Sequence, residues 1–518
     1  MPSLARQERR SHLQTLSRRR TLALASLVGA LAGLSAVLFR LAVEATETWR
    51  EQATSTLWSE HQWVGLIVML LGGAAVGALS SWLTEAFCPE AAGSGIPHVK
   101  AVLVTGRHLR AWRLIATKVG AGLLSLGAGM SLGREGPTVH IGASAAEAFS
   151  GAVRLPGRVR RSLIAAGAGA GLAAAFNAPL AGFLFIMEEL RRDLSRGTYA
   201  TALVASLASV SVTRLLLGYE SVFTLSDPGP LRLTSLPSLI AVGLLAAPVG
   251  LAFNTLLLRS TAQPGRRVLR GALAGAFCGI LALLLPQATG GGNNLTLTLL
   301  QGNDAANLIW SHLLLLLVVK LLFTVFCYAS GVPGGFFAPL LTMGAVLGAL
   351  VSVTLQTVMP AITPSPERLA VIGMAAVLTA AVRAPLTGVV LIVEMTGQYH
   401  TLFSLLVASL VAYAACEVAR SEPIYEALLE RDLKKGGKRE KITTFEVTVE
   451  SGSDYDGATV AKLGLPPSAL LALVERDGGG LVPKGSTGLL AGDVVTVVAG
   501  VDCDDATLAA LLERFRGA

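Results

Sequence analysis

Long uncharged apolar runs are the feature that most constrains the fold of this chain. Residues 64–82 and 238–258 contain no charged side chain, and each approaches or exceeds the roughly 20 apolar residues that a helix needs to cross a bilayer. Of the 518 residues, 52% are hydrophobic and only 15% are charged. The sequence therefore predicts an all-α polytopic membrane protein. The run 21–43 is too long for a cleaved signal sequence.

Basic residues flank this apolar region and account for much of the formal net charge of +8. Arg18, Arg19 and Arg20 precede the first run, and Lys434 and Lys435 follow the last. Lysine and arginine accumulate on the cytoplasmic side of membrane proteins, so both termini are expected in the cytoplasm. A basic run beside a hydrophobic span sets topology more often than it binds nucleic acid, and no nucleic-acid partner is expected.

Composition divides the chain into four parts. A basic cytoplasmic arm is expected at 1–20, a transmembrane transport domain at 21–430, a basic linker at 431–444 and a small cytoplasmic α/β domain at 445–518. Within the last part, β-branched runs bounded by glycines predict strands at 445–449 and 493–498. A closing helix is expected at 506–515.

The membrane region contains an internal repeat. The pattern Ala-Pro-Leu-x-Gly-x-x-x-Ile-x-Glu begins at Ala178 and recurs from Ala384. A glycine–proline–glycine set recurs at nearly the same offset, Gly133, Pro137 and Gly142 against Gly335, Pro339 and Gly344. Two related halves follow, about 21–218 and 236–430. An odd number of crossings per half would invert them, which is a frequent transporter design, but the sequence leaves their relative orientation open.

Glu135 is the leading functional candidate. It lies in the motif Gly-Arg-Glu-Gly-Pro at 133–137, and an ionisable residue at membrane depth marks a functional site by default. Gly136 and Pro137 suit a helix start, where exposed N–H groups attract anions. An anion and a proton would thus compete for one place. The alternative is a glutamate neutralised by a neighbouring arginine. The repeat partner of Glu135 is Phe337, so only one half brings a carboxylate.

Three glycine-rich stretches together carry a resemblance to a known family. They are Gly-Ser-Gly-Ile-Pro at 93–97, the motif at 133–137, and Gly-Phe-Phe-Ala-Pro at 335–339, with Tyr425 near the end of the membrane region. In this order they resemble the chloride channel and chloride/proton exchanger (CLC) family, over about residues 21–430. The resemblance implies an inverted-repeat fold of tilted and re-entrant helices, assembled in the bilayer as a homodimer with one pore per subunit.

The resemblance also assigns an anion site. The hydroxyls of Ser94 and Tyr425 and the backbone N–H groups of Phe336 and Phe337 would hold the anion, and Glu135 would be the external gating glutamate. Dipoles and hydroxyls can hold a halide without a full positive charge, which would bind it too tightly for release. The alternatives are that Ser94 is only a turn residue and that Tyr425 is an interfacial anchor.

Glu189 decides between two kinds of transport. It follows an apolar stretch and precedes Arg191 and Arg192, so an arginine-paired helix end is one interpretation. In exchangers that the chain resembles, a glutamate at this position passes protons between the cytoplasm and the external glutamate, whereas channels commonly have a neutral residue. The sequence thus predicts secondary active chloride/proton antiport, with a passive chloride channel as the alternative and nitrate or fluoride as less favoured anions. Glu394, the repeat partner of Glu188, is expected to be structural.

No catalytic chemistry is indicated. Neither the five cysteines nor the seven histidines show metal-ligand spacing, and no His-Glu-x-x-His motif or serine–histidine arrangement is present. We therefore expect no metal, no cofactor and no enzymatic activity. Lys100 and Lys118 are left without an obvious partner, because His98-Val99-Lys100 stands where acidic residues are common in the bacterial exchangers.

The C-terminal part resembles the regulatory module of potassium-uptake and potassium-channel proteins. The resemblance rests on Leu-Gly-Leu-Pro at 463–466 and Leu-Ala-Gly-Asp at 490–493. It implies a regulatory domain, for which an unidentified small-molecule ligand and a plain assembly role both stay open. The likeness to bacterial exchangers places the protein in a bacterial inner membrane.

Overall fold

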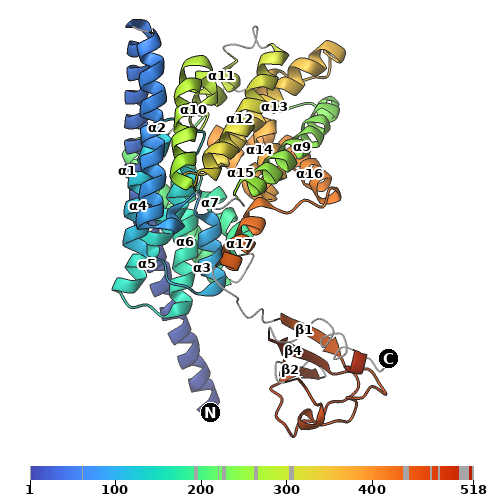
Figure 1. Cartoon of the computed structure of the whole chain (residues 1–518). Helices are drawn as coiled ribbons and strands as arrows, with labels where there is room; N and C mark the ends of the chain where they lie inside the picture. The colour runs from blue at the N-terminus through green and yellow to red at the C-terminus, as the bar shows by residue number, and fades with distance from the viewer. Residues whose placement is uncertain are drawn as a thin grey trace. The chain divides into compact units, whose positions relative to one another are not determined.

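The computed structural model describes residues 2–60, 62–191, 196–219, 221–223, 229–261, 266–302, 309–435, 443–466, 469–476, 479–500 and 513–515. The chain divides into two compact units, Met1–Glu430 and Arg431–Ala518, each with a hydrophobic core of its own. The first unit is helical, and among the described residues eight helices are long and apolar enough to cross a membrane. The predicted all-α membrane fold is confirmed (Figure 1).

The first half of the membrane unit consists of eight α-helices and a short π-helical segment. They are α1 (Pro2–Glu60), α2 (Gln62–Phe87), α3 (Ile96–Thr105), α4 (Ala111–Gly127), α5 (Glu135–Ala152), α6 (Gly157–Phe176), α7 (Pro179–Phe185), the π-helical segment (Ile186–Arg191) and α8 (Arg196–Leu217).

The second half repeats much of this order. It contains α9 (Leu236–Thr261), α10 (Arg267–Leu284), α11 (Asn293–Gln301), α12 (Trp310–Ala329), α13 (Phe337–Val358), α14 (Pro366–Val382), α15 (Pro385–Thr396), α16 (Leu402–Val418) and α17 (Ile424–Lys435). Helices α3, α7, α11 and α15 have only 10, 7, 9 and 12 residues. These are too short to span a bilayer, which takes about 20 residues, so their ends lie inside the unit.

The repeated glycines bring helices into close contact at equivalent places. A Cβ added at Gly142 would lie 2.3 Å from the carbonyl oxygen of Gly167, and one added at Gly344 would lie 2.3 Å from that of Gly373. Helix α5 thereby packs backbone to backbone on α6, and α13 packs on α14 in the same way. Small residues permit such an approach in membrane helices, which explains why glycine occupies both repeat positions.

The two halves are inverted with respect to each other. Gly133 and Gly335, which are repeat equivalents, exchange two backbone hydrogen bonds of 2.7 Å in an antiparallel pair. Reciprocal antiparallel pairing of equivalent residues relates their surroundings by a local two-fold axis. Figure 1 shows α5 and α13 extending from this point toward opposite ends of the membrane unit. The structure thus decides the orientation that the sequence left open.

Two glutamates cap helices of the opposite half. The carboxylate of Glu394 accepts hydrogen bonds from the backbone N–H groups of Leu180 (3.1 Å) and Ala181 (2.8 Å) at the start of α7. The carboxylate of Glu188 accepts the equivalent bonds from Leu386 (3.2 Å) and Thr387 (2.7 Å) at the start of α15. Helix N-termini lack acceptors for these N–H groups, so the predicted structural role of Glu394 is confirmed and Glu188 shares it.

We expect Glu394→Ala to destabilise the membrane unit without changing transport coupling. The variant loses two charge-assisted bonds, which together contribute about 2 kcal/mol, whereas Glu394→Gln keeps one acceptor oxygen and should lose less. Thermal unfolding of the purified protein checks the order wild type, Gln, Ala. An unchanged unfolding temperature for the alanine variant would contradict the capping role.

The second unit is built on a four-stranded antiparallel sheet of order β1-β4-β2-β3. The strands are β1 (Thr443–Thr448), β2 (Ala469–Arg476), β3 (Gly479–Leu481) and β4 (Val494–Ala499). The predicted strands at 445–449 and 493–498 are confirmed as β1 and β4, shifted by one or two residues. Strand β2 was not predicted because its Ala-Leu-Leu-Ala-Leu run favours helix. Most of the helix expected at 506–515 lies outside the described residues.

A buried carboxylate in this unit gives a pH-dependent stability. Arg476 donates two hydrogen bonds to Asp493, of 2.7 and 2.6 Å, and these bonds hold the pKa of Asp493 below its usual value. Because this pKa is lower in the folded than in the unfolded chain, the stabilisation is complete above the ordinary aspartate pKa of about 3.9. It is lost as the pH falls through the folded-state pKa.

We expect Asp493→Asn to lower the stability of this unit at neutral pH by about 2 kcal/mol. The stability of the variant should also change less than that of the wild type as the pH falls below 4. Hydrogen exchange of peptides covering β4, corrected for intrinsic exchange rates, measures both effects. Parallel pH profiles for the two proteins would show that Asp493 is not the titrating group.

Candidate functional site

Three helices begin at one place in the interior of the membrane unit. The loop before α3 is joined to the loop before α13 by two backbone bonds of 3.0 Å, Gly93 N–H to Val332 and Gly334 N–H to Gly93, and the Gly133–Gly335 pair adds α5. The first N–H groups of each helix precede its first intrahelical bond and have no acceptor within it. Three positive helix ends therefore converge, which is favourable for an anion.

Ser94 lies buried at this convergence. Its Oγ is 3.5 Å from the hydroxyl of Tyr328, and its backbone N–H donates to that hydroxyl over 3.4 Å. Gly136 packs directly on it, because a Cβ at Gly136 would lie 2.7 Å from Ser94 Cβ and 3.0 Å from Gly335 Cα. The glycine of the Glu135 motif is thus what permits the start of α5 to touch the Ser94 loop.

Tyr425 closes the site from the first turn of α17. Its ring stacks on the rings of Phe336 and Phe337, with centroids 5.1 and 6.1 Å apart. Its hydroxyl is buried and has no hydrogen-bond partner, and the first N–H to donate within α13 is that of Leu340. A buried hydroxyl without a partner is unusual in a folded protein and is suited to bind a ligand. The Tyr425 hydroxyl and the amides of Phe336 and Phe337 are therefore available to one.

Glu135 begins α5 and is buried at the meeting point of the two halves. Its carboxylate interacts with its own backbone amide and with that of Ala338 in the first turn of α13, while its Oε2 atom is buried without a partner. Arg134 instead donates a 2.8 Å bond to Glu44. The carboxylate thus lies against helix N-termini, as an anion would, and its neighbouring arginine pairs elsewhere.

Glu189 lies in the π-helical segment and is paired with a lysine. Lys100 Nζ is 2.6 Å from Glu189 Oε1 and 3.0 Å from Glu426 Oε1. The side chains of Arg191 and Arg192, the partners considered from the sequence, lie outside the described residues. The structure therefore identifies one partner of Glu189 and also answers what neutralises Lys100.

Lys118 is satisfied by backbone carbonyls. Its Nζ donates to Ala91 (2.8 Å) and Gly93 (2.7 Å) in the loop before α3. Lys320, its repeat counterpart, does the same in the loop before α11, with bonds to Ala288 (3.1 Å), Thr289 (3.3 Å) and Gly290 (2.7 Å). Each lysine fixes the glycine loop from which a short helix begins.

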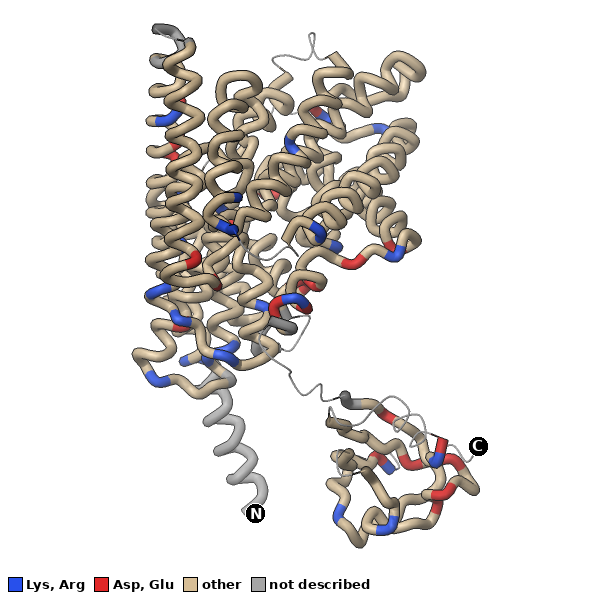
Figure 2. The backbone as a smooth tube through the Cα atoms, viewed as in Figure 1, with Lys and Arg blue, Asp and Glu red and all other residues tan. Residues whose placement is uncertain are grey.

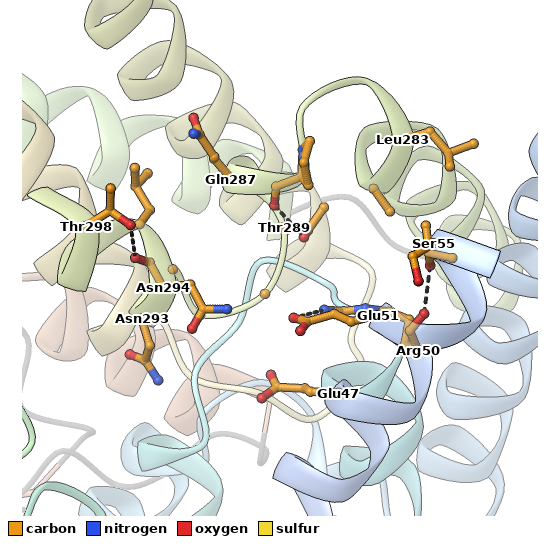
Figure 3. A pocket seen from close by; sticks show the side chains of 17 residues that line it. Glu47, Arg50, Glu51, Ser55, Leu283, Gln287, Thr289, Asn293, Asn294 and Thr298 are labelled. Carbon is orange, nitrogen blue, oxygen red and sulfur yellow. Dashed lines mark hydrogen bonds and ion pairs between the residues drawn. The ribbon is translucent and has the colours of Figure 1, made fainter. Parts of the chain in front are cut away.

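A cavity of about 480 Å³ lies between α1 and the loop before α11, with charged residues of α1 among those that line it. Figure 3 shows Glu47, Arg50 and Glu51 of α1 facing the loop that leads to Asn293 and Asn294. Glu47 interacts electrostatically with Glu135. Another lining residue of this cavity, Gly291, lies beside Ala338 and Leu132, next to the starts of α13 and α5. The cavity thus extends to the neighbourhood of the starts of α5 and α13, although Glu135 does not line it.

Sequence reasoning missed two residues of this region, Tyr328 and Glu426, and it did not identify the partners of Lys100. Tyr328 lies in an apolar helix without any motif, so nothing in the local sequence marks it. Glu426 directly follows Tyr425 and is charged, which was the available signal. The partner of Lys100 could not be read locally, because its two bonds join residues 89 and 326 positions apart.

These features define a class: a polytopic membrane protein with inverted repeats, in which helix N-termini and a buried carboxylate converge at a place suited to an anion. The family model described as "Voltage gated chloride channel" matches residues 76–417, and a TrkA-C domain model matches residues 444–505. The chain belongs to the voltage gated chloride channel family. The predicted likeness of its C-terminal part to a potassium-uptake regulatory module is confirmed.

Curated relatives cover most of the chain. The H(+)/Cl(-) exchange transporter ClcA of Vibrio vulnificus is 36% identical over 433 residues, 81% of this chain and 91% of the relative. The transporter of the same name in Salmonella arizonae is 35% identical over 425 residues, 80% of this chain and 89% of the relative.

Solved structures share the fold. A slow cyanobacterial Cl-/H+ antiporter matches with a TM-score of 0.76 and 35% identity over 81% of this chain and 99% of its own. A CLC-type fluoride/proton antiporter matches with a TM-score of 0.66 at 22% identity, over 79% and 98% of the two chains. The second likeness concerns the fold alone.

Proposed function

We propose that this protein is a secondary active transporter that exchanges chloride for protons across a membrane. The observation that carries the proposal is Glu135, a buried carboxylate with an unpartnered oxygen at the convergence of helix N-termini. Relatives named H(+)/Cl(-) exchange transporters, which align with about four fifths of the chain, support it. So does the likeness to a cyanobacterial Cl-/H+ antiporter.

Chloride and the Glu135 carboxylate compete for the same N–H groups in this mechanism. The ionised carboxylate is held by the positive helix ends. Protonation removes its charge, so the side chain leaves and chloride takes its place. The hydroxyls of Ser94 and Tyr425 and the amides of Phe336 and Phe337 hold the ion farther in. These donors carry no full charge, which keeps the site weak enough for release.

Glu189 supplies the second proton-accepting group. A proton that leaves Glu135 toward the opposite side of the membrane needs an acceptor there, and Glu189 is a buried carboxylate near the start of α17. Tyr425 at that start interacts electrostatically with both Glu135 and Glu189. A passive chloride channel, the alternative function, has no use for this second carboxylate.

We extend the proposal to orientation and assembly. Arg107 and Arg154 lie in the loops after α3 and α5, and Arg160 lies in the first turn of α6. Figure 2 shows Lys and Arg gathered at that end of the membrane unit. Positive residues mark the cytoplasmic side, so Glu189 faces the cytoplasm and both termini are cytoplasmic. The bacterial relatives support a bacterial inner membrane. We also propose a homodimer, as the resemblance to the chloride channel and exchanger family implies. Each subunit would have its own site, because one chain supplies every residue named for it.

The test is paired flux measurement on purified protein in liposomes. With a chloride gradient as the sole driving force, an exchanger moves protons against their own gradient until an uncoupler collapses it. We expect this uphill proton movement. Chloride flux without proton movement would make the protein a passive channel, and absence of both from well-folded protein would reject anion transport.

Ser94→Pro is expected to weaken the discrimination between chloride and nitrate. Proline removes both the hydroxyl and the backbone N–H that bonds to Tyr328, so the anion loses a donor and the loop loses a constraint. A change of a few-fold or more corresponds to about one hydrogen bond. Competition between the two anions in liposome flux measures the effect. Unaltered selectivity would show that Ser94 is only a turn residue.

A further inference from the structure

We propose that Glu426 is a working part of the proton site, as the carboxylate that compensates the charge of Lys100. The inference rests on the proposed exchange function and names a residue that the function has not used. Lys100 lies between two carboxylates, 2.6 Å from Glu189 and 3.0 Å from Glu426. The three side chains come from α3, the π-helical segment and α17.

The three side chains of this cluster, Glu189, Lys100 and Glu426, differ in solvent exposure. The side chains of Glu189 and Lys100 are 2% and 4% exposed, whereas that of Glu426 is 30% exposed. Glu426 is thus the member that water reaches, and Glu189 is the innermost. Glu188, next to Glu189 in sequence, directs its carboxylate to the start of α15 and is not part of the cluster.

The charges show why Lys100 requires a second carboxylate. With Glu189 alone, the pair Lys100–Glu189 would be neutral, and a proton added to Glu189 would leave a buried ammonium uncompensated, which is strongly unfavourable. With Glu426 ionised, the cluster has a net charge of −1 before proton uptake and zero after it. Uptake then removes a buried charge instead of creating one. Glu426 therefore permits Glu189 to be protonated beside a lysine.

The partly exposed Glu426 also marks where water reaches the cluster. When Glu189 takes up a proton from this water, Lys100 stays an ammonium beside the ionised Glu426. Lys100 is then a charge to be compensated and does not itself carry the proton. Because Tyr425 and Glu426 are neighbours, the first turn of α17 serves both ions, with Tyr425 stacked on the phenylalanines of the anion site and Glu426 bonded to Lys100.

The test compares three variants in the paired flux assay. Glu426→Gln should lower the number of protons moved per chloride about tenfold, because a proton added to Glu189 would then leave the buried ammonium of Lys100 uncompensated. Chloride flux should persist. Glu430→Gln, an exposed glutamate one turn later on α17, should keep the wild-type ratio. Lys100→Met combined with Glu426→Gln should restore much of the ratio, because no ammonium is left to compensate.

The double variant distinguishes charge compensation from a structural role. If the defect came from lost packing, the double variant would move fewer protons per chloride than Glu426→Gln. A wild-type ratio in Glu426→Gln, or a double variant as uncoupled as the single one, would overturn the inference. If Glu426→Gln does not fold, the charge can be tested with Glu426→Cys, whose thiol is modified after the protein has folded. An anionic thiol reagent should restore the ratio of protons to chloride, and a cationic reagent should not. Equal effects of the two reagents would overturn the inference. A wild-type protein that moves chloride without protons would instead overturn the proposed function.

Discussion

Replacing Glu135 by glutamine is expected to abolish chloride-driven proton movement while chloride flux continues. Glutamine has nearly the shape of glutamate but cannot carry the proton, and losing an essential acid–base group costs about a hundredfold or more. In the wild type, the carboxylate of Glu135 lies against the amides that begin α5 and α13. An amide side chain has no negative charge for these helix ends to hold, so chloride gains access to the N–H groups.

The measurement is the same pair of fluxes, with Glu147→Gln as the matched control. Glu147 lies on the same helix and is also buried, but it pairs with Arg160 and His108 away from the site. Its loss should lower stability and leave the ratio of protons to chloride as in the wild type. Proton pumping at the wild-type rate by Glu135→Gln would remove Glu135 from the mechanism.

Glu189→Ala is expected to stop proton movement and to leave chloride flux through the site at Ser94, Tyr425 and Phe337. The reduction in protons per chloride should again reach about a hundredfold. Lys100 keeps its bond to Glu426 in this variant, so the buried ammonium is not left without a counter-charge. We therefore expect Glu189→Ala to fold and to be defective only in the coupling of proton movement to chloride flux.

Glu188→Gln is the matched control for this prediction. It changes the adjacent glutamate, which caps α15, and should reduce thermal stability without changing the ratio of protons to chloride. If Glu189 served only to anchor Lys100, Glu189→Ala would behave like this control. Coupling at the wild-type ratio in Glu189→Ala would therefore refute the proton role.

Local sequence predicted the helix starts because their causes are local. Pro97, Pro137 and Pro339 each lie in the first turn of a helix. Proline has the required φ there, and its missing N–H costs no intrahelical hydrogen bond. Glu135 could be predicted as a candidate site residue because a carboxylate in an apolar segment is costly wherever it packs. Likewise, the β-branched residues of β1 and β4 identified those strands, whereas the leucines and alanines of β2 did not.

The sequence by itself determined a membrane protein with two related halves, glycine-rich helix starts and a carboxylate at one of them. Apolar length, repeated motifs and local backbone preference can all be recognised along the chain without knowing which residues pack together. Only the tertiary structure decided that the halves are inverted, that Tyr328 and Tyr425 flank the site, and that Lys100 binds both Glu189 and Glu426. These pairings join residues far apart in the chain, and a buried charge takes whichever partner the packing of helices brings within reach.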